Sequence, residues 1–458
     1  MLSSKIFREY DIRGIVDKEI NEEVMLKIAK AFSKILKEKN VNSCIIAHDA
    51  REYSEKLKNS FVEGLLNSSI NVVDIGLTIT PAAYFAQYYF NIKGIAMITA
   101  SHNPNGWSGL KLGYDFCSTL MPNDIKYLQK LIAEGNFPKK NNVGSYKAKE
   151  INDIYIKSLA ERVEFEKKLK VVVNCRNGTA SIVAPKIFEA VGCKVIKLHC
   201  NIDFSFPNGN PNPSEDEMLK ETANVVIKNN ADIGFAFDGD ADRLGVVDDK
   251  GRIVYSDRVL ALLSKEILQK RKNAKIVYDV KCSQLLEDYI KINNGIPIMW
   301  KTGHSYIKKK AKEENAALAG ERSGHIFIFD DYYGYDDACF AALRLLKIVQ
   351  NESLSKILDL LPKYYTSPTY HLHCDDEKKY EIVEKLKNHF SKKFKEINCI
   401  NGIRIKLHNG WFLIRASSNL PALVIVFESR NKEDLEKIEK FLKEELSNLG
   451  INEEWYIA

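Results

Sequence analysis

Apolar and polar positions alternate with two different periods along the first three quarters of the chain. Residues 43–51 form an apolar run that ends in charge, 54–69 have the spacing of an amphipathic helix, and 70–76 are apolar again. The same order of apolar run and helical stretch recurs over 169–192 and from 274 onwards. Short strands that alternate with helices predict α/β units built on a mostly parallel or mixed sheet.

The pattern changes near residue 364. A Lys-rich helix, a hairpin over 402–417, a strand over 422–429 and a helix over 432–448 follow one another there. This order predicts a smaller α+β domain at the C-terminus. With further boundaries near Lys147 and Gly251, we divide the chain into the domains 1–147, 148–251, 252–363 and 364–458.

Three segments of this pattern share one form, an apolar run followed by a polar loop rich in glycine and charge. They are 94–104, 233–243 and 316–325. Ligands of open α/β sheets bind beyond the carboxyl ends of the strands. We therefore expect three such loops, from three similar domains, to face one shared cleft.

The composition is typical of a large globular protein. The 458 residues are 45% apolar and 28% charged, and the net charge is only +6 with both signs interleaved, which does not favour a nucleic-acid-binding protein. The nine cysteines are scattered without a C-x-x-C pair, as in a cytosolic protein with reduced thiols. The N-terminal residues are polar, and no apolar stretch reaches the ~18 residues of a spanning helix. We expect a soluble, cytoplasmic protein that binds no membrane.

The loop after residue 237 carries Asp238, Asp240 and Asp242 at alternate positions. Three carboxylates this close repel one another unless a cation lies among them, and oxygen-only ligands suit Mg²⁺. An EF-hand is excluded because Arg243 stands where its sharp turn needs glycine. A solvated acidic turn is the alternative, which the apolar strand before the loop and the adjacent Arg243 disfavour.

Ser101 lies in the polar loop of the first of the three segments, in the stretch Thr-Ala-Ser-His-Asn-Pro. A bare serine is a poor nucleophile and a poor metal ligand. A phosphorylated serine carries a charge of about −1.5 to −2 and three strong acceptor oxygens. It would bind a metal and hold a phosphoryl group ready for transfer, with Lys111 and Arg243 as candidate cations.

Seven motifs together resemble the α-D-phosphohexomutases, in the phosphomannomutase/phosphoglucomutase group. They are FREYDIRG (7–14), TASHNP (99–104), DGDADR (238–243), DVKCS (279–283), WKTGHSYIKKK (300–310), GERSGH (320–325) and RASSNLP (415–421). They occur in order over nearly the whole chain. Arg322 departs from the pattern, since methionine is usual there, and Ser418-Asn419-Leu420 also differs from the usual loop.

The resemblance implies an architecture and a reaction. It implies four domains around a central cleft, a phosphoserine at Ser101 and Mg²⁺ on Ser101, Asp238, Asp240 and Asp242. The implied enzyme is an isomerase, an intramolecular phosphotransferase that interconverts hexose 6-phosphate and hexose 1-phosphate. Mannose, and with it glucose, is the expected sugar. Hexose 1,6-bisphosphate is the expected intermediate and activator, and phosphoryl transfer needs mainly positioning and charge neutralisation.

The resemblance also assigns roles to single residues. Catalysis is expected from Ser101, His102, Lys111, Arg243 and Arg13. Substrate binding is expected from Tyr10, Lys281, Gly303, His304, Glu321, Ser323, His325, Arg415, Ser417, Ser418 and Asn419. The alternatives are a surface role for Lys111, a simple pair of Arg13 with Asp11, and a turn position for His304.

Other interpretations of the chain stay open. A phosphoglucosamine mutase is the second candidate enzyme, and a non-catalytic phosphosugar-binding relative is the candidate from another class. His371 and His373 lie on one face of an expected strand, which we interpret as strand rather than zinc site. A hinge is expected over 363–368, and the protein is expected to be a monomer or a weak homodimer.

Overall fold

The computed structural model describes residues 3–138, 142–418 and 420–457. It divides into two compact units, Met1–Leu263 with Ser323–Asp359, and Ser264–Arg322 with Leu360–Ala458. The chain has four domains, three α/β domains with mixed sheets and a C-terminal domain with an antiparallel sheet, which confirms the predicted fold class. The third domain is shared between the two units. The domain boundaries at 147, 251 and 363 stay predictions.

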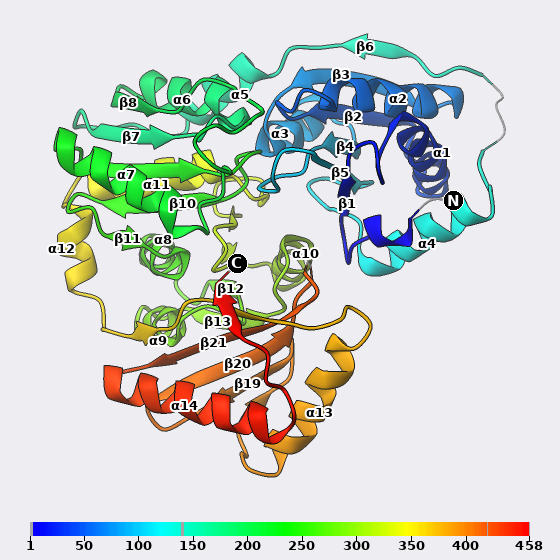
Figure 1. The fold of residues 1–458 in the computed structure, drawn as a ribbon. Coiled ribbons are helices and arrows are strands. Elements are labelled where there is room, and N and C mark those ends of the chain that lie inside the picture. The colour runs from blue at the N-terminus through cyan, green and yellow to red at the C-terminus, as the bar shows by residue number, and fades with distance from the viewer. Residues whose placement is uncertain (1–2, 139–141, 419, 458) are drawn as a thin grey trace. The chain divides into compact units, whose positions relative to one another are not determined.

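The first domain is built on a six-stranded sheet in the order β1-β5-β4-β2-β3-β6 (Figure 1). Strands β2, β3, β4 and β6 run parallel, whereas β5 is antiparallel to β4 and to β1. Its elements are η1 (Ser4–Ile6), β1 (Ile12–Ile15), α1 (Glu22–Glu38), β2 (Ser43–His48), α2 (Ser54–Asn67), β3 (Asn71–Leu77), α3 (Thr80–Phe90), β4 (Gly94–Ile98), β5 (Trp107–Gly113), α4 (Pro122–Ala133) and β6 (Tyr146–Ala148).

The second domain repeats this arrangement with five strands in the order β11-β10-β9-β7-β8. Here β7 is parallel to β8 and β9, and β10 is antiparallel to β9. Its elements are α5 (Asn152–Ala160), β7 (Lys170–Asn174), η2 (Thr179–Ile182), α6 (Ala184–Ala190), β8 (Lys194–Leu198), α7 (Asp216–Asn229), β9 (Ile233–Phe237), β10 (Leu244–Asp248) and β11 (Ile253–Val254). Strands β4 and β9 thus occupy equivalent places, and each ends in a polar loop that returns as an antiparallel strand.

The third domain places β12 between two parallel neighbours, β13 and β14, in the second unit. Its elements are α8 (Ser256–Lys270), β12 (Lys275–Asp279), α9 (Gln284–Ile292), β13 (Ile296–Trp300), α10 (His304–Glu314), β14 (Leu318–Gly320), β15 (Ile326–Ile328), α11 (Ala338–Val349) and α12 (Leu354–Asp359). The last three of these elements belong to the first unit.

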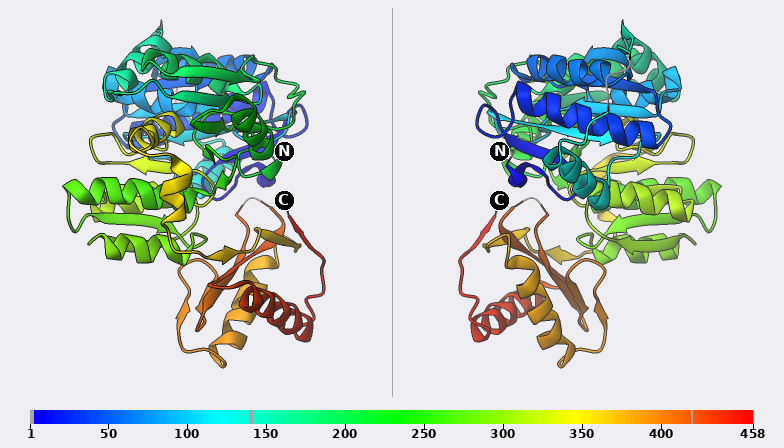
Figure 2. Two further views of the ribbon diagram at one scale, coloured as in Figure 1. Left: turned by 90° about the vertical axis from the view of Figure 1, so that its left-hand side faces the viewer. Right: turned by 90° about the vertical axis from the view of Figure 1, so that its right-hand side faces the viewer.

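The C-terminal domain has an antiparallel sheet in the order β18-β19-β20-β21-β17-β22, with β16 also paired to β21. Helices α13 and α14 cover one face of it, around the buried Phe390, Phe412 and Leu442 (Figure 2). Its elements are β16 (Tyr365–Thr366), β17 (Tyr370–His373), α13 (Lys379–Ser391), β18 (Ile397–Asn398), β19 (Ile403–Lys406), β20 (Gly410–Ala416), β21 (Ala422–Ser429), α14 (Lys432–Asn448) and β22 (Trp455–Ile457).

Side-chain caps set the starts of several helices. Asn21 accepts a hydrogen bond from the Val24 backbone at the start of α1, and Asn431 accepts one from Asp434 at the start of α14. Among the described residues, no helix is long and apolar enough to cross a membrane.

Candidate active site

Ser101 lies in the loop that follows β4, and its backbone is left-handed with φ of 50°. Its hydroxyl Oγ donates to Oδ2 of Asp238 at 2.7 Å and lies 3.2 Å from Nδ1 of His102. A left-handed backbone is unusual outside glycine and has to be held by its surroundings. The loop therefore presents the serine oxygen directly to the carboxylate loop of the second domain.

The two loops are in close backbone contact. A Cβ atom at Gly239 would lie 2.3 Å from the Ser101 carbonyl oxygen, so only glycine fits at that position. The same carbonyl accepts a hydrogen bond from Arg51 at 3.1 Å, and Arg51 is in turn paired with Asp49. Buried groups from the end of β2 thus hold the serine loop from its other side.

The three aspartates of the carboxylate loop are fully buried at the carboxyl end of β9. One carboxylate oxygen of each aspartate lies within 4.8 Å of one carboxylate oxygen of each of the other two. Oδ1 of Asp238 accepts hydrogen bonds from the backbone of Asp242 at 3.0 Å and of Arg243 at 3.1 Å, which shapes the loop. The predicted trio is therefore one compact cluster, not a solvated turn.

Lys111 lies on β5, beside the serine loop, and is buried. Its Nζ donates to Oδ2 of Asp240 at 2.8 Å and to Oδ2 of Asp242. Thr80, at the start of α3, donates its hydroxyl to Oδ2 of Asp240 at 2.6 Å. The surface role considered for Lys111 is excluded, because the lysine is part of the cluster.

Opposing effects of burial and charge set the pKa values here. Burial, and then the carboxylates of Asp242 and Asp240, raise the pKa of Asp238 well above its ordinary value. Burial would raise the pKa of Asp240 too, but the Lys111 ammonium outweighs it and lowers this pKa below the ordinary value. Burial would lower the pKa of Lys111, but Asp240 and Asp242 raise it. Lys111 and Asp240 are thus a charged pair, and the trio as a whole carries excess negative charge.

The donor set fits a divalent cation. Oδ1 of Asp240 and Oδ1 of Asp242 have no hydrogen-bond partner among the residues that the structure describes. Buried carboxylate oxygens without partners are unfavourable, and oxygen-only ligands suit a hard cation such as Mg²⁺. Asp238, Asp240 and Asp242 would hold it, with the adjacent Ser101 oxygen as the further candidate ligand.

Two more predicted residues lie beside Ser101. Arg13, on β1, donates to the Ala100 carbonyl at 2.7 Å and to Asn103 Oδ1 at 2.6 Å, besides its pair with Asp11 at 3.1 Å. The arginine therefore does more than pair with Asp11, because it also holds the serine loop. Burial, followed by the charges of Arg243 and Arg13, lowers the pKa of His102 well below its ordinary value, so this imidazole is neutral. Tyr10 is buried as well.

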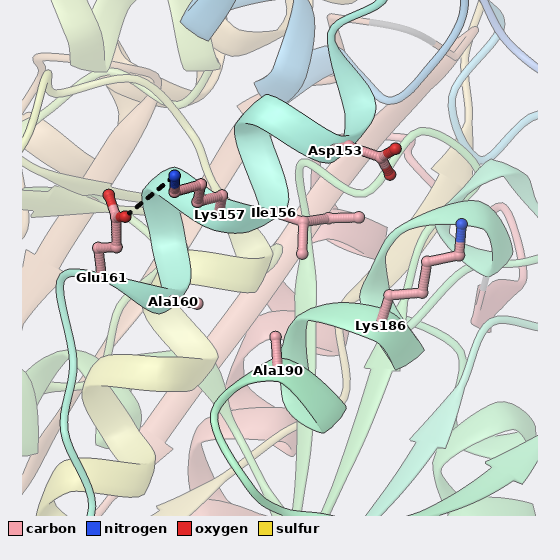
Figure 3. A pocket seen from close by; sticks show the side chains of 7 residues that line it. All are labelled: Asp153, Ile156, Lys157, Ala160, Glu161, Lys186 and Ala190. Atoms are coloured by element: carbon pink, nitrogen blue, oxygen red, sulfur yellow. Dashed lines mark ion pairs between the residues drawn. The ribbon is translucent and has the colours of Figure 1, made fainter.

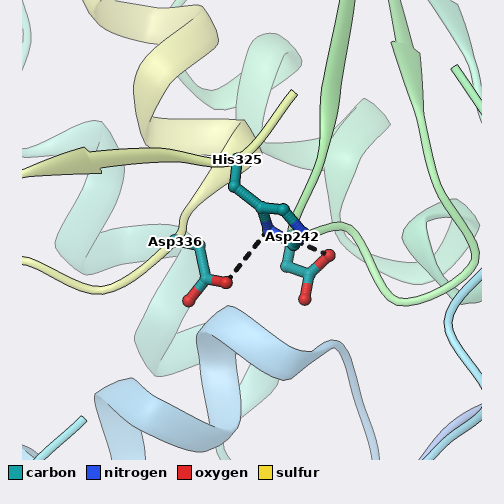
Figure 4. A group of neighbouring side chains, drawn as sticks. All are labelled: Asp242, His325 and Asp336. Atoms are coloured by element: carbon teal, nitrogen blue, oxygen red, sulfur yellow. Dashed lines mark ion pairs between the residues drawn. The ribbon is translucent and has the colours of Figure 1, made fainter. Parts of the chain in front are cut away.

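Arg243 and His325 are joined by hydrogen bonds in the first unit. Nε of Arg243 donates to Nε2 of His325 at 3.0 Å, and Nδ1 of His325 lies 3.1 Å from Oδ2 of Asp336 and 3.7 Å from Oδ1 of Asp242. Figure 4 shows the imidazole between the two carboxylates. Both ring nitrogens of His325 thus face protein groups, and the imidazole holds the Arg243 side chain beside the carboxylate loop.

The second unit gathers the other polar residues of the predicted sugar site. The buried Glu321, just after β14, accepts a hydrogen bond from the backbone of Gly303, whose φ is 128°. Lys281 Nζ lies 3.9 Å from Oδ2 of Asp279. Burial lowers the pKa of Lys281, although Asp279 and Glu321 act to raise it. His304 is buried at the start of α10.

The predicted phosphate loop follows β20 in the same unit. Arg415 is buried, and its Nη2 donates to Oγ of Ser418 at 2.9 Å. Oγ of Ser417 accepts from the Leu420 backbone at 3.1 Å, and Lys379 donates to the Ser417 carbonyl at 2.6 Å. Asn419 lies outside the described residues. These hydrogen bonds hold the loop. Nε of Arg415 has no hydrogen-bond partner among the described residues.

The predicted sugar loop is divided between the units. Glu321 and Arg322 belong to the second unit, and Ser323 and His325 to the first. Ser323 accepts a hydrogen bond from Ser214 at its carbonyl, at 3.3 Å. Within its unit, Arg322 donates to the carbonyls of Ser367 at 3.1 Å and Lys281 at 3.4 Å.

Two surface hollows of the first unit are lined by other residues. One, of about 460 Å³, lies between α5 and α6, where Ile156, Ala160 and Ala190 form its apolar side and Lys157 pairs with Glu161 at 3.8 Å (Figure 3). The other, of about 540 Å³, lies beside β3 around the buried pair of Lys58 and Asp74. Neither is lined by a residue of the predicted site.

Several residues that hold the site were not predicted. They are Asp49, Arg51, Thr80, Asp279, Asp336 and Lys379. Asp49 directly follows the apolar strand β2 and Asp279 is the last residue of the apolar strand β12, which is the kind of signal that identified Asp238. Thr80 and Lys379 carry no such signal, because their contacts are with residues far away in sequence.

Four domain families match the chain in order. They are the phosphoglucomutase/phosphomannomutase alpha/beta/alpha domains I over residues 4–139, II over 153–251 and III over 255–364, and the C-terminal domain over 372–445. A phosphomannomutase/phosphoglucomutase of Pseudomonas putida is 38% identical over 97% of this chain and 96% of its own. A phosphoglucomutase of Neisseria gonorrhoeae is 35% identical over 96% of both chains.

The fold also matches a solved structure. A phosphoglucomutase/phosphomannomutase family protein from Burkholderia thailandensis has a TM-score of 0.93 at 33% identity, covering 99% of this chain and 100% of that one. The domain order and the site define a member of the α-D-phosphohexomutase superfamily. Within it, the chain belongs to the phosphomannomutase/phosphoglucomutase family.

Proposed function

We propose that the protein interconverts hexose 6-phosphates and hexose 1-phosphates, with mannose and glucose as sugars. The observation that carries this proposal is the 2.7 Å hydrogen bond from Ser101 Oγ to Asp238, inside the buried cluster of three aspartates. Relatives of 35–38% identity over nearly the whole chain support it, three named phosphomannomutase/phosphoglucomutase and one named phosphoglucomutase. The enzyme is then an isomerase that moves a phosphoryl group within one sugar.

Ser101 carries the phosphoryl group in this proposal. A hydroxyl oxygen of the bound hexose monophosphate attacks the phosphorus of phosphoserine 101, the new O–P bond forms and the Oγ–P bond breaks. The sugar hydroxyl loses its proton and the freed Ser101 oxygen gains one, so the step is balanced. The resulting hexose 1,6-bisphosphate reorients within the site, so that its other phosphoryl group faces Ser101 and is transferred back to Oγ. Lys111, Arg243 and Arg13 supply positive charge near the transferred group, which is the main requirement of phosphoryl transfer.

Asp238, Asp240 and Asp242 would hold Mg²⁺. When bound, the cation would neutralise charge on the phosphoryl oxygens and on the carboxylates. The protein's own contribution is to keep the three aspartates apart in fixed positions, through Lys111, Thr80 and the backbone bonds to Asp238. Hexose 1,6-bisphosphate would act as activator, since it phosphorylates Ser101.

The second unit supplies sugar and phosphate recognition in this proposal. Glu321 accepts hydrogen bonds from sugar hydroxyls, with Lys281, Gly303 and His304 of the same unit. The resemblance also implies substrate binding by Tyr10, Ser323 and His325, which belong to the first unit. The non-reacting phosphate is bound by the loop after β20, through Arg415, Ser417, Ser418 and Asn419. Arginine suits this role because its forked donors match a phosphate.

A coupled assay tests the proposal. Purified protein with Mg²⁺ and glucose 1,6-bisphosphate is given mannose, glucose, glucosamine and N-acetylglucosamine 1-phosphates. We expect turnover of the mannose and glucose esters. Turnover of only the amino sugars would favour a phosphoglucosamine mutase, and binding without turnover would favour a non-catalytic relative, although that class is expected to lack Ser101 or an aspartate.

The proposal includes a cellular setting and an oligomeric state. A cytoplasmic enzyme that acts as a monomer or a weak homodimer, on small phosphosugars and without nucleic acid, fits the composition. Light scattering over a range of protein concentrations measures the oligomeric state. A tight tetramer would contradict this part of the proposal.

A further inference from the structure

A row of side chains crosses the C-terminal sheet from the phosphate loop to β17. Arg415 on β20 is paired with Val424 on β21, and Val424 is paired with His371 on β17. Directly opposed residues of neighbouring strands point to the same face of a sheet. His371 therefore lies on the same face as Arg415, two strands away.

The middle of this row contacts the segment that carries Lys281. Val424 belongs to a buried cluster with Trp411, Leu413, Val426 and Val280, and Lys281 directly follows Val280. Burial first, and then the positive charges of Lys281 and Arg415, lower the pKa of His371 to about 4. Both cations are thus close enough to act on the imidazole, and on the other neighbouring strand the ring centre of Tyr456, which is paired with His371, lies 5.7 Å from the imidazole centre.

The imidazole is poorly satisfied where it lies. His371 is only 9% exposed, and its Nδ1 has no hydrogen-bond partner in the described part of the chain. Arg415, 4% exposed, likewise has an unpartnered Nε. A buried polar group without a partner is unfavourable, and a neutral imidazole beside two cations gains from an anion that contacts all three.

We propose that His371 is a phosphate-binding residue that joins Arg415 and Lys281 around the non-reacting phosphate of the hexose phosphate. The proposal rests on the proposed function, because that phosphate belongs to the substrate of the reaction. Without phosphate, the two cations favour the neutral imidazole. A bound phosphate dianion favours the protonated form instead, so the imidazole takes one proton from solvent and donates a charge-assisted hydrogen bond to the phosphate. The proton returns to solvent when the sugar phosphate leaves.

Proton-linked calorimetry tests this coupling. Binding of glucose 1-phosphate to the full-length Ser101→Ala variant is measured at pH 7 in two buffers with different heats of ionisation. We expect net proton uptake on binding. Adding His371→Asn to the Ser101→Ala protein should abolish this uptake and weaken the binding of glucose 1-phosphate by about three- to tenfold. In the enzyme with Ser101 intact, His371→Asn is expected to raise KM more than it lowers kcat.

Two other histidines of the same domain are matched controls. His408 lies exposed in the turn between β19 and β20, and His373 lies exposed one row further along the His371 face. Uptake that persists in His371→Asn, or that His373→Asn removes instead, overturns the proposal. His408→Asn should change neither uptake nor affinity, and a change as large as that of His371→Asn would contradict a local effect.

Thermal unfolding and hexose phosphate binding distinguish a failure of the His371 role from a misfolded variant and from a failure of the proposed function. If thermal unfolding shows that His371→Asn is not folded, His371→Gln replaces it, because glutamine keeps a donor but cannot take up the proton. A folded Ser101→Ala protein that binds no hexose phosphate contradicts the proposed function itself. Normal binding with the same proton uptake in all variants contradicts only the role of His371.

Discussion

Ser101 Oγ donates a 2.7 Å hydrogen bond to Asp238 across 137 positions of sequence. The serine lies in the loop after a strand of the first domain, and the aspartate directly follows the equivalent strand of the second. Gly239 lets the two loops touch, since any side chain there would collide with the Ser101 carbonyl. The contact between two similar domains therefore brings the serine and the aspartate together, and neither domain contains this pair alone.

A phosphoryl group is expected on Ser101. Intact mass of fresh protein, or of protein incubated with glucose 1,6-bisphosphate, should show a fraction with one added phosphoryl group that peptide mapping assigns to Ser101. Ser101→Ala should lose both this mass and turnover, whereas Ser60→Ala, on α2, should keep both. Phosphate that maps only to other residues would contradict the covalent mechanism through Ser101.

Metal removal should abolish turnover. EDTA is expected to stop the reaction and Mg²⁺ to restore it, because the buried Asp trio repels the phosphoryl group without a cation. Mg²⁺ at a hundredfold excess over its Kd should also raise the free energy of unfolding by about 2.7 kcal/mol. Asp240→Asn should lose this stabilisation and Asp203→Asn, in a loop of the same domain, should retain it. Full activity in EDTA counts against the metal assignment.

Lys111 should be a stabilising residue as well as a catalytic one. Lys111→Met leaves Asp240 and Asp242 without their ammonium partner, and breaking a buried ion pair costs about 3–5 kcal/mol of the free energy of unfolding. Urea unfolding measures this loss, which should shrink when Mg²⁺ is present. Lys111→Arg keeps the charge and should lose less. If Lys111→Met lost the same unfolding free energy with and without Mg²⁺, Lys111 would not be coupled to the metal site.

Arg415 and Glu321 should differ in their effect on sugar preference. Arg415→Ala removes a charge-assisted contact to phosphate, so kcat/KM for mannose and glucose phosphates should fall by similar factors, about ten- to a hundredfold or 1.5–3 kcal/mol. Glu321→Ala acts on hydroxyl recognition and should change the ratio between the sugars. A strong shift of that ratio by Arg415→Ala, or no effect of it on either sugar, contradicts the phosphate assignment.

The buried Asp337 should make stability depend on pH. Burial raises the pKa of Asp337 to about 6, although Tyr155 and Tyr332 donate hydrogen bonds to it. Because the folded pKa exceeds the unfolded one of about 3.9, the folded state binds the proton more tightly, and this stability is lost as the pH rises through 6. Relative to Asp337→Asn, the protein should gain about 2 kcal/mol in the free energy of unfolding between pH 7 and pH 4. A parallel pH dependence of the two proteins would refute this.

Local patterns predicted many elements closely. The strand over 422–429 and the helix over 432–448 have the predicted bounds, and α2 and β3 differ from their predicted ranges by one or two residues. These elements are determined locally because their hydrophobic period and caps are contained in the segment itself. The carboxylate cluster was predictable for a similar reason, since its three aspartates stand at alternate positions of one loop.

The sequence by itself therefore determined the order of elements, the serine and aspartate loops and the family. Only the tertiary structure decided which distant residues lie beside those loops, and which lie beside the phosphate loop of the C-terminal domain. Lys111 could have been a surface lysine, and His371 was interpreted as an ordinary strand residue. Their places follow from strand pairing, of β5 with β4 and of β17 with β21, which joins residues far apart in sequence. Such pairing depends on the packing of whole sheets, and no short segment encodes it.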